Sequence, residues 1–269
     1  MQIDYRPIIT SSEIEQTVDL HGQVWGASDR DAIPAHVLHA INHAGGLLLG
    51  AFDGSQLVGF ALAFPAVLEG ELLLWSHATG VLPAYQGRGI GRQLKWLQRD
   101  WALEQGYNCI GWTYDPLQAK NANFNIAVLG CICNRYLDDF YGEVDDDLNR
   151  GLPTDRFEVR WWLSTERVWR CAAGAALALD MDGVTPVLVQ TASGEPGQIT
   201  WPAGETTVAV EIPERISQAH GQSLSHALAW RMATRQVFHR LFAMGYVVEG
   251  FVRSQSCPVH CYYILRMAT

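Results

Sequence analysis

The residues whose types and spacing most directly suggest chemistry form one short segment. It holds three glycines at alternating positions with two arginines among them: Gln86, Gly87, Arg88, Gly89, Ile90, Gly91 and Arg92. Glycine has no Cβ atom and adopts positive φ angles, so the backbone here can approach a ligand and gather its N–H groups into one concavity. A helix that begins in the segment adds unpaired N–H groups and the positive end of its dipole. The segment therefore predicts a cradle for an anion, and for a pyrophosphate in particular.

The glycine spacing separates this segment from two other phosphate-binding motifs. A Walker loop ends in Gly-Lys followed by Ser or Thr, and no Lys-Ser or Lys-Thr pair follows Gly91. A Rossmann fingerprint has the spacing Gly-x-Gly-x-x-Gly and a later acidic residue for the ribose, which Gly87, Gly89 and Gly91 do not match. The sequence therefore disfavours a nucleotide hydrolase of the P-loop type.

The segment lies between a strand and a helix, in a part of the chain where the two alternate. Strands are expected at 3–9, 46–52, 56–65, 71–81, 109–114 and 131–136, and helices at 11–25, 34–45, 91–105 and 121–130. In the helix after the glycines, an apolar stripe recurs at helical period: Ile90, Leu94, Leu97 and Trp101. Alternation of this kind predicts an α/β fold with helices on both faces of a sheet.

An acidic, turn-forming stretch at 145–153 predicts a boundary between a first domain, 1–150, and a second domain, 151–269. The second domain is expected to hold strands at 157–163, 184–190, 206–212, 246–252 and 261–267, with a long helix at 224–244. Its strand, helix, Gly245-Tyr246 and following strand repeat the order of elements, including Gly106-Tyr107, found at 71–114. It is therefore interpreted as a smaller α/β half-domain, either a degenerate copy of the first or an ordinary βαβ unit.

Composition and charge exclude several classes of protein. Hydrophobic residues make up 48% of the 269 and charged residues 17%, which is typical of a folded chain and not of a disordered one. The net charge of −9 argues against a nucleic acid or an anionic membrane as a partner. The most apolar run, 171–179, is far shorter than the roughly 20 residues that cross a bilayer.

The N-terminal residues and the cysteines indicate a cytoplasmic location. Residues 1–7 lack a basic stretch followed by an apolar one, so no secretory signal is expected. Six cysteines without a framework spacing predict free thiols in a reducing cytosol. No metal site is expected, because neither Cys131-Ile-Cys133 nor the segment 257–261 supplies four ligands at a zinc spacing.

The glycine segment resembles the acyl-CoA loop of the GCN5-related N-acetyltransferase (GNAT) superfamily, whose pattern is Gln/Arg-x-x-Gly-x-Gly/Ala. Gln86, Gly89 and Gly91 occupy those places, and Val81-Leu82-Pro83 matches the strand end that precedes them in the family. The order of elements over 1–142 also matches. The resemblance implies a mixed, twisted sheet flanked by helices, with acetyl-CoA or another acyl-CoA as co-substrate.

The resemblance also implies where the acyl-CoA lies. Its pantetheine arm is expected in a gap between the fourth and fifth strands, beside the backbone of Val81. The helix at 121–130 carries three asparagines, which are expected to bond the pantetheine or the nucleotide, one of them being a helix cap. The implied contacts to acyl-CoA are Val81, Gln86, Gly87, Arg88, Gly89, Ile90, Gly91, Arg92 and Asn123.

The implied reaction, attack of an amine on the thioester, needs a general base. The fourth strand offers Glu69, Glu71 and His77. His77 is favoured because an unperturbed histidine has a pKa of about 6.5 and accepts a proton at neutral pH. Alternation along the strand places it on the same face as Val81. Glu71, acting through a water molecule, is the alternative base, and a packed core histidine is the alternative interpretation of His77.

The general acid departs from the family pattern. The position of the tyrosine that usually protonates the leaving thiolate holds Ile126. The acid is therefore expected from Tyr136 or Tyr141, just after the next strand, or is dispensable. For each tyrosine, a packed aromatic ring with a bonded hydroxyl is the alternative interpretation.

Two arginines suggest how an acceptor is held. Arg231 and Arg235 lie four residues apart on the long C-terminal helix, hence on one side of it, and two guanidinium groups there suit a carboxylate. Solvated surface arginines are the alternative.

The leading hypothesis is an acyl-CoA-dependent N-acyltransferase that transfers an acetyl or succinyl group to a small amine such as an amino acid. Long GNAT proteins with a C-terminal extension resemble a group associated with such reactions. The alternative is a non-catalytic acyl-CoA-binding or regulatory protein of the same fold, which the missing tyrosine at 126 motivates. The expected partner is a small-molecule amine, without nucleic acid or membrane, and a homodimer is left open.

Overall fold

The computed structural model describes residues 2–26, 33–142, 151–175, 181, 183–216, 223–255 and 259–268. The chain divides into two compact units, Met1–Trp112 (unit 1) and Thr113–Thr269 (unit 2). This division comes earlier in the chain than the boundary expected near residue 150, and the acidic residues 145–150 that suggested that boundary lie outside the described residues. The sequence domains 1–150 and 151–269 therefore stay a prediction.

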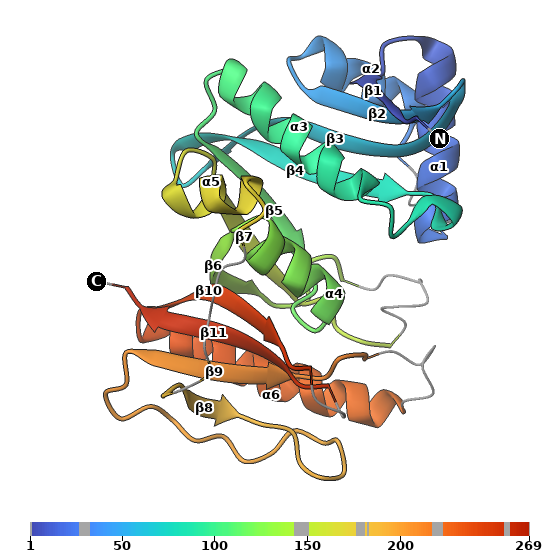
Figure 1. Cartoon of the computed structure of the whole chain (residues 1–269). Helices are drawn as coiled ribbons and strands as arrows, with labels where there is room; N and C mark the ends of the chain where they lie inside the picture. The colour runs from blue at the N-terminus through green and yellow to red at the C-terminus, as the bar shows by residue number, and fades with distance from the viewer. Residues whose placement is uncertain are drawn as a thin grey trace. The chain divides into compact units, whose positions relative to one another are not determined.

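Unit 1 is built on a sheet with the strand order β1-β2-β3-β4-β5. Its strands are β1 (Asp4–Pro7), β2 (Leu47–Asp53), β3 (Gln56–Leu68), β4 (Glu71–Val81) and β5 (Cys109–Tyr114), whose last two residues begin unit 2. Its helices are α1 (Ser11–Trp25), α2 (Ala35–His43), the 3-10 turn η1 (Pro83–Tyr85) and α3 (Ile90–Glu104) (Figure 1). Neighbouring strands are antiparallel except β4 and β5, which are parallel. The strands and helices predicted up to residue 114 are therefore confirmed.

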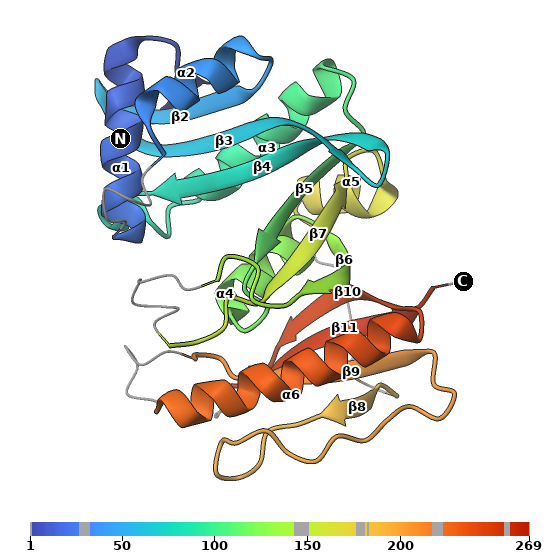
Figure 2. The same cartoon turned by 180° about the vertical axis from the view of Figure 1, so that it is seen from behind.

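Helices cover both faces of this sheet, α1 and α2 on one face and α3 on the other (Figures 1 and 2). Two consecutive residues of β4 show the division. A Cβ atom at Gly80 would lie 2.9 Å from the ring of Trp25 in α1, whereas a Cβ atom at Gly91 in α3 would lie 3.8 Å from the side chain of Val81. Consecutive strand residues point to opposite faces, so each helix has its own row of β4 side chains.

The ends of α1 follow from local chemistry. Thr10 Oγ1 accepts a hydrogen bond from the Glu13 N–H at 3.3 Å, and the Glu13 carboxylate accepts one from the Thr10 N–H at 3.2 Å. This reciprocal capping box satisfies donors that the first turn leaves unpaired. The cap is Thr10, the residue directly before the helix. Gly26, with a φ of 62°, ends the helix in a left-handed conformation.

Unit 2 has the strand order β7-β6-β10-β11-β9-β8. Its strands are β6 (Ile132–Leu137), β7 (Arg156–Trp162), β8 (Thr185–Leu188), β9 (Thr207–Ile212), β10 (Tyr246–Arg253) and β11 (Cys261–Met267). Its helices are α4 (Ala119–Ala122), the π-helix η2 (Asn123–Val128), α5 (Glu166–Ala172) and α6 (Leu224–Ala243). Sequence patterns missed α5 and gave no sign that the helix expected at 121–130 becomes π-helical after one turn.

The repeat noted in the sequence is present as an order of elements but not as a strand pairing. β4 and β5 pair directly, whereas β11 lies between β9 and β10 and is antiparallel to both. The unit formed by β9, α6 and β10 is therefore a split βαβ arrangement. The interpretation of unit 2 as a degenerate copy of a GNAT half stays a prediction.

Three further observations concern the classes of protein considered above. Within the described residues, no helix combines the length and the hydropathy that a bilayer span requires. The described cysteines are buried free thiols, and burial raises the pKa of Cys261 to about 11, so this thiol stays protonated at neutral pH. Over the same described ranges, no three or more His, Cys, Asp or Glu side chains are placed to hold a metal ion.

A buried ion pair lies in unit 2. The guanidinium of Arg231, on α6, donates to both carboxylate oxygens of Asp115, at 2.8 and 2.9 Å, and Arg231 is 1% exposed. Burial alone would raise the pKa of Asp115, but the charge and hydrogen bonds of Arg231 outweigh it and lower that pKa. Each ion compensates for the desolvation of the other, so removal of one leaves an uncompensated buried charge.

We expect Arg231→Met to lower the free energy of unfolding by about 3–5 kcal/mol, because the Asp115 carboxylate would stay buried without its partner. The double variant Arg231→Met/Asp115→Asn, which removes both charges, should recover a large part of this loss. Urea unfolding followed by circular dichroism measures both. Arg170→Met, which removes an exposed charge from α5, is the control and should change stability little. A single variant as stable as this control would contradict the prediction.

Candidate functional site

The glycine segment joins β4 to α3 and leaves its backbone open. Gly87 and Gly89 have φ angles of +77° and +79°, the left-handed region that favours glycine. A Cβ atom at either residue would meet nothing within 4 Å. Gly89 is the N-cap of α3, and its carbonyl accepts the N–H of Gln93 at 2.9 Å. The N–H groups of 90–92 precede the first intrahelical bond and are available to an anion.

Side chains around the segment fix its shape. The Gln86 amide donates to the carbonyl of Val81 at 3.1 Å, which closes the turn after β4. The hydroxyl of Tyr85 donates to Asp53, the last residue of β2, at 2.9 Å, and the guanidinium of Arg88 lies 5.3 Å from the centre of the Tyr85 ring. The bond from Gln86 means that a ligand paired with the Val81 carbonyl must share that acceptor.

Beside this segment β4 and β5 separate. β4 continues to pair with β3 as far as Val81, but its pairing with β5 consists of Leu74 with Ile110 and Trp75 with Gly111. From Ser76 onward, the edge of β4 that faces β5 is no longer paired with it. We call this divergence, residues 76–81 of β4 with Trp112 of β5, the fork. An unpaired strand edge offers N–H and C=O groups to an extended ligand.

His77 lies at the start of the fork, in a β-bulge. Leu62 of β3 pairs with Ala78, and the next residue, Ala63, pairs with Ser76, so His77 is the extra residue. Its ring centroid lies 5.9 Å from that of Phe64, on the face that α1 covers.

The bulge corrects one expectation. Ser76 accepts a hydrogen bond from a side chain of α3, and Val81 packs against α3, so both lie on the face that α3 covers. His77 lies on the opposite face, and the expectation that His77 and Val81 share a face is therefore wrong. A bulge places two successive side chains on one side of the sheet, which reverses the alternation that the expectation used.

A second histidine lies near His77. His77 keeps part of its surface exposed, but the groups packed around it partly desolvate the ring and lower its pKa below 6.5. The pKa of His21, on α1, is lowered by desolvation and by the charge of His77. His21 Nδ1 is buried and has no hydrogen-bond partner among the described residues. Both rings are therefore neutral at pH 7. Sequence reasoning missed His21, because only the packing of α1 on the sheet brings it to β4.

Glu71 lies at the other end of β4. It is exposed and begins the strand, six residues before His77, which is about 20 Å along an extended chain. Glu69 lies in the turn before it, with a φ of 56°. The structure therefore does not bring the two predicted bases together, and His77 is the one at the fork.

The tyrosines proposed as acids have different surroundings within unit 2. Tyr136 is buried, its hydroxyl donates to Asp155 at 2.7 Å, and burial raises its pKa far above the ordinary value. Tyr141 is 49% exposed, and its hydroxyl lies 3.2 Å from Thr113 Oγ1. Of the two, Tyr141 has the accessible hydroxyl.

The residues of η2 divide in the same way between buried and exposed. Ile126 is fully buried and Asn125 is buried, whereas Asn123 is exposed. Asn123 can therefore meet a ligand from solvent, and no hydroxyl stands at 126.

The two arginines of α6 do lie on one side of the helix, but carboxylates of the chain itself occupy them. Arg235 donates from Nε to Asp155 Oδ2 at 2.9 Å and from a terminal nitrogen to Oδ1 at 2.5 Å. Arg231 donates to Asp115 from its two terminal nitrogens. The expectation that this pair holds an acceptor carboxylate is revised for this reason: an acceptor would have to displace buried internal partners.

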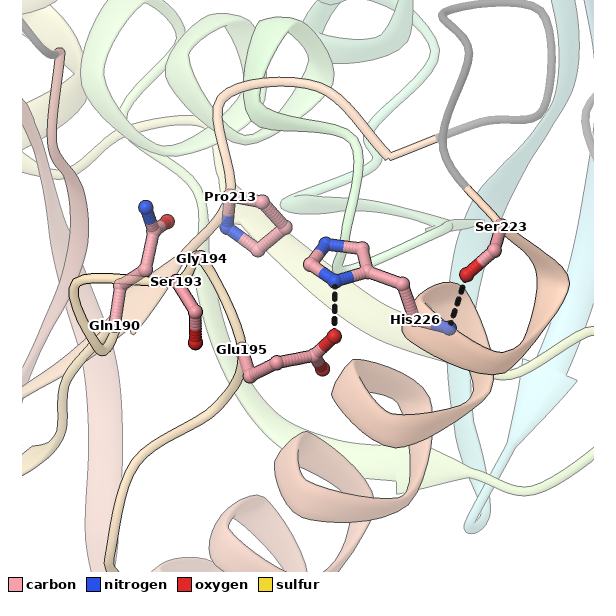
Figure 3. A pocket seen from close by; sticks show the side chains of 7 residues that line it. All are labelled: Gln190, Ser193, Gly194, Glu195, Pro213, Ser223 and His226. Atoms are coloured by element: carbon pink, nitrogen blue, oxygen red, sulfur yellow. Dashed lines mark hydrogen bonds and ion pairs between the residues drawn. The ribbon is translucent and has the colours of Figure 1, made fainter.

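Unit 2 also contains a cavity of about 310 Å³ that sequence reasoning did not anticipate (Figure 3). Its lining is polar and comes from the ends of β8 and β9 and the start of α6: Gln190, Ser193, Gly194, Glu195, Pro213, Ser223 and His226. His226 Nδ1 lies 3.0 Å from Glu195 Oε1, and the N–H of His226 donates to the hydroxyl of Ser223 at 3.2 Å. These bonds join the loop and the helix that form its wall.

Comparison with known proteins identifies the class. Residues 14–124 match the model of the family described as "Acetyltransferase (GNAT) family". The matched segment includes the glycine segment, the fork and the bulge. These residues form a GNAT acetyltransferase domain, and the predicted fold class, a mixed sheet flanked by helices with a C-terminal extension, is confirmed. No curated protein matches the sequence.

Solved structures of GNAT proteins share the fold. A putative GNAT acetyltransferase from Desulfovibrio desulfuricans is 16% identical with a TM-score of 0.50, over 61% of this chain and 100% of that one. The NatC complex bound to Gag peptide and CoA is 17% identical with a TM-score of 0.50, over 61% of this chain and 100% of that one. The ribosomal-protein-S18-alanine N-acetyltransferase from Escherichia coli is 14% identical with a TM-score of 0.49, over 61% of this chain and 96% of that one. At these identities the likeness to the first two structures is one of fold.

The glycine segment can be tested with a matched pair of variants. Gly89→Ala places a Cβ atom on a left-handed residue, which costs about 1–2 kcal/mol. Gly106, after α3, has a φ of +84° and equally open surroundings, so Gly106→Ala carries the same strain away from the segment. We expect both variants to lose a similar amount of stability. Only Gly89→Ala should also bind CoA more weakly, by about tenfold or more in the Kd measured by calorimetry. Equal CoA affinity in the two variants would contradict the prediction.

Proposed function

We propose that the chain transfers an acyl group from a coenzyme A thioester to an amine. The observation that carries this proposal is the open, left-handed glycine segment at the start of α3, directly beside the fork between β4 and β5. The N–H groups of 87–91, with Arg88 and Arg92, would bind the pyrophosphate. The pantetheine arm would lie along 76–81, which brings the thioester toward His77.

The GNAT domain and one of its relatives support an acyl-CoA as the co-substrate. The NatC structure is described as having CoA bound, and its fold is shared over the whole of that chain. In this chain, two features suit CoA: an anion cradle for the diphosphate and an unpaired strand edge for the amide-containing arm. Asn123, which the family resemblance implies as a further contact to the cofactor, is exposed on η2 of unit 2, and its contact stays a prediction.

The chain's own residues then have separate roles. Neutral His77 takes a proton from the acceptor ammonium, and the amine nitrogen bonds to the thioester carbon as the carbon–sulfur bond breaks. The nitrogen gives up its second proton as the amide forms, and the departing thiolate takes up one proton, so the products are the amide and the CoA thiol. The general acid stays the prediction made from the sequence, Tyr136 or Tyr141; of these two residues of unit 2, Tyr136 already donates its hydroxyl to Asp155, which favours Tyr141. Orientation of the two substrates supplies most of the rate, and proton transfer adds a factor of about 10² to 10⁴.

For the acceptor we propose a small primary amine, such as an amino acid, with acetyl or succinyl as the acyl group. The NatC structure holds a peptide, so a panel of acceptors includes peptides with a free N-terminus beside small amines.

One observation favours a second candidate, an acyl-CoA-binding protein without turnover. Ile126 is fully buried at the place where the family's acid stands, so η2 supplies no hydroxyl there.

Release of free CoA separates these two candidates. With acetyl-CoA or succinyl-CoA and the panel of amines, we expect a thiol reagent to detect CoA at a rate that depends on the amine. The wild-type chain without an amine is the control. Tight binding of the thioester by calorimetry, together with no amine-dependent thiol release, would favour the binding protein and exclude the transferase.

Replacement of His77 tests the base. A base acts only when deprotonated, and desolvation lowers the pKa of His77, so kcat should rise with pH through a midpoint below 6.5 and then level off. We expect His77→Ala to abolish this acid limb and lower kcat by about 10²-fold, with the KM for acyl-CoA nearly unchanged. Glu71→Gln should keep both the limb and the rate. Full turnover by His77→Ala, or loss of the limb in Glu71→Gln, would assign the base elsewhere.

A further inference from the structure

Lys95, on α3, is a buried charge that the chemistry above does not use. It is 3% exposed. Its ammonium donates to Ser76 Oγ at 2.9 Å and to Gln98 Oε1 at 2.7 Å. It also lies 3.8 Å from the centre of the Trp112 ring, a cation–π contact. All of these residues belong to unit 1.

These contacts lie where the two strands diverge. The last paired residues are Trp75 of β4 and Gly111 of β5. Ser76 and Trp112 are the next residues of each strand, so the ammonium touches both arms of the fork at its origin. Gln98, one turn further along α3 and fully buried, holds the ammonium from the helix side.

Ser76 also precedes His77, the residue of the bulge. A hydrogen bond to Ser76 from a buried side chain of α3 therefore fixes the strand directly before the point where the proposed base leaves the regular ladder. Lysine is among the residues least often buried, and an apolar side chain of similar length would fill the same space without desolvating a charge. A buried ammonium at this position is therefore best explained by what it holds in place.

We propose that Lys95 is a positioning residue that sets the separation of β4 and β5 at the fork, and with it the place of the pantetheine arm. The ammonium joins one arm through a hydrogen bond and the other through the π face of Trp112, so the two arms keep a fixed distance. This inference rests on the proposed function, because it concerns how the acyl-CoA is held.

The test uses two ligands that differ in the part that enters the fork. CoA carries the pantetheine arm, whereas adenosine 3′-phosphate 5′-diphosphate is its nucleotide portion without the arm. We expect Lys95→Met to raise the Kd for CoA about tenfold, the effect of one lost hydrogen bond to a charged group, and to leave the Kd for the nucleotide within about twofold. Calorimetry on the full chain measures both.

Two further variants keep the test decisive. Lys95→Arg retains a cation over Trp112 and should bind CoA more tightly than Lys95→Met. Ser76→Ala removes only the hydrogen-bond acceptor on β4. It should raise the Kd for CoA, and not that for the nucleotide, as Lys95→Met does, and it replaces that variant in the test if Lys95→Met does not fold. Arg170→Met, an exposed charge on α5, is the control and should bind both ligands as the wild type does.

Each remaining outcome overturns a definite statement. Equal weakening of both ligands in Lys95→Met and Ser76→Ala, or no weakening of either, overturns the role of Lys95 at the fork. Failure of the wild-type chain to bind CoA overturns the proposed function itself, before any variant is compared.

Discussion

Parallel pairing between β4 and β5 lasts for two residue pairs, and the proposed site exists because it stops there. Had it continued, the backbone groups of 76–81 would be bonded to β5 and closed to a ligand. β4 keeps its extended form beyond that point because β3 still pairs with its other edge as far as Val81. One edge of β4 is thus bonded to β3, and the backbone groups of the other edge are not bonded to β5. An extended ligand can bind along such an edge in the place of a strand.

The glycine segment completes this arrangement by turning the chain from the end of β4 into α3 with its N–H groups exposed. Two residues in the left-handed region make that turn, and their surroundings are open. The anchors are side chains: Gln86 on the Val81 carbonyl and Tyr85 on Asp53. A rigid turn with unpaired donors binds an anion without ordering itself first, so little conformational entropy is lost on binding.

Internal partners decide which predicted residues remain in the site. Arg231, Arg235 and Tyr136 bond to Asp115 and Asp155, so their polar groups serve the stability of unit 2. His77 and Tyr141 are exposed and keep side chains that a substrate can reach. In the sequence, all five residues are equally good candidates for the site because their side chains can all bind or transfer protons. Only their burial and their bonds to other side chains, which the structure shows, distinguish them.

The elements of unit 1 and the family could be predicted from the sequence, and the glycine segment could be singled out, because these depend on local properties: glycine spacing, apolar periodicity and the order of strands and helices. The sequence did not reveal the bulge at His77, the proximity of His21, or the contacts of Lys95 with Ser76 and Trp112. Nor did it show that β11 enters between β9 and β10. Each of these joins residues distant along the chain, and only the packing of helices on sheets and the register of strands decides which of them meet.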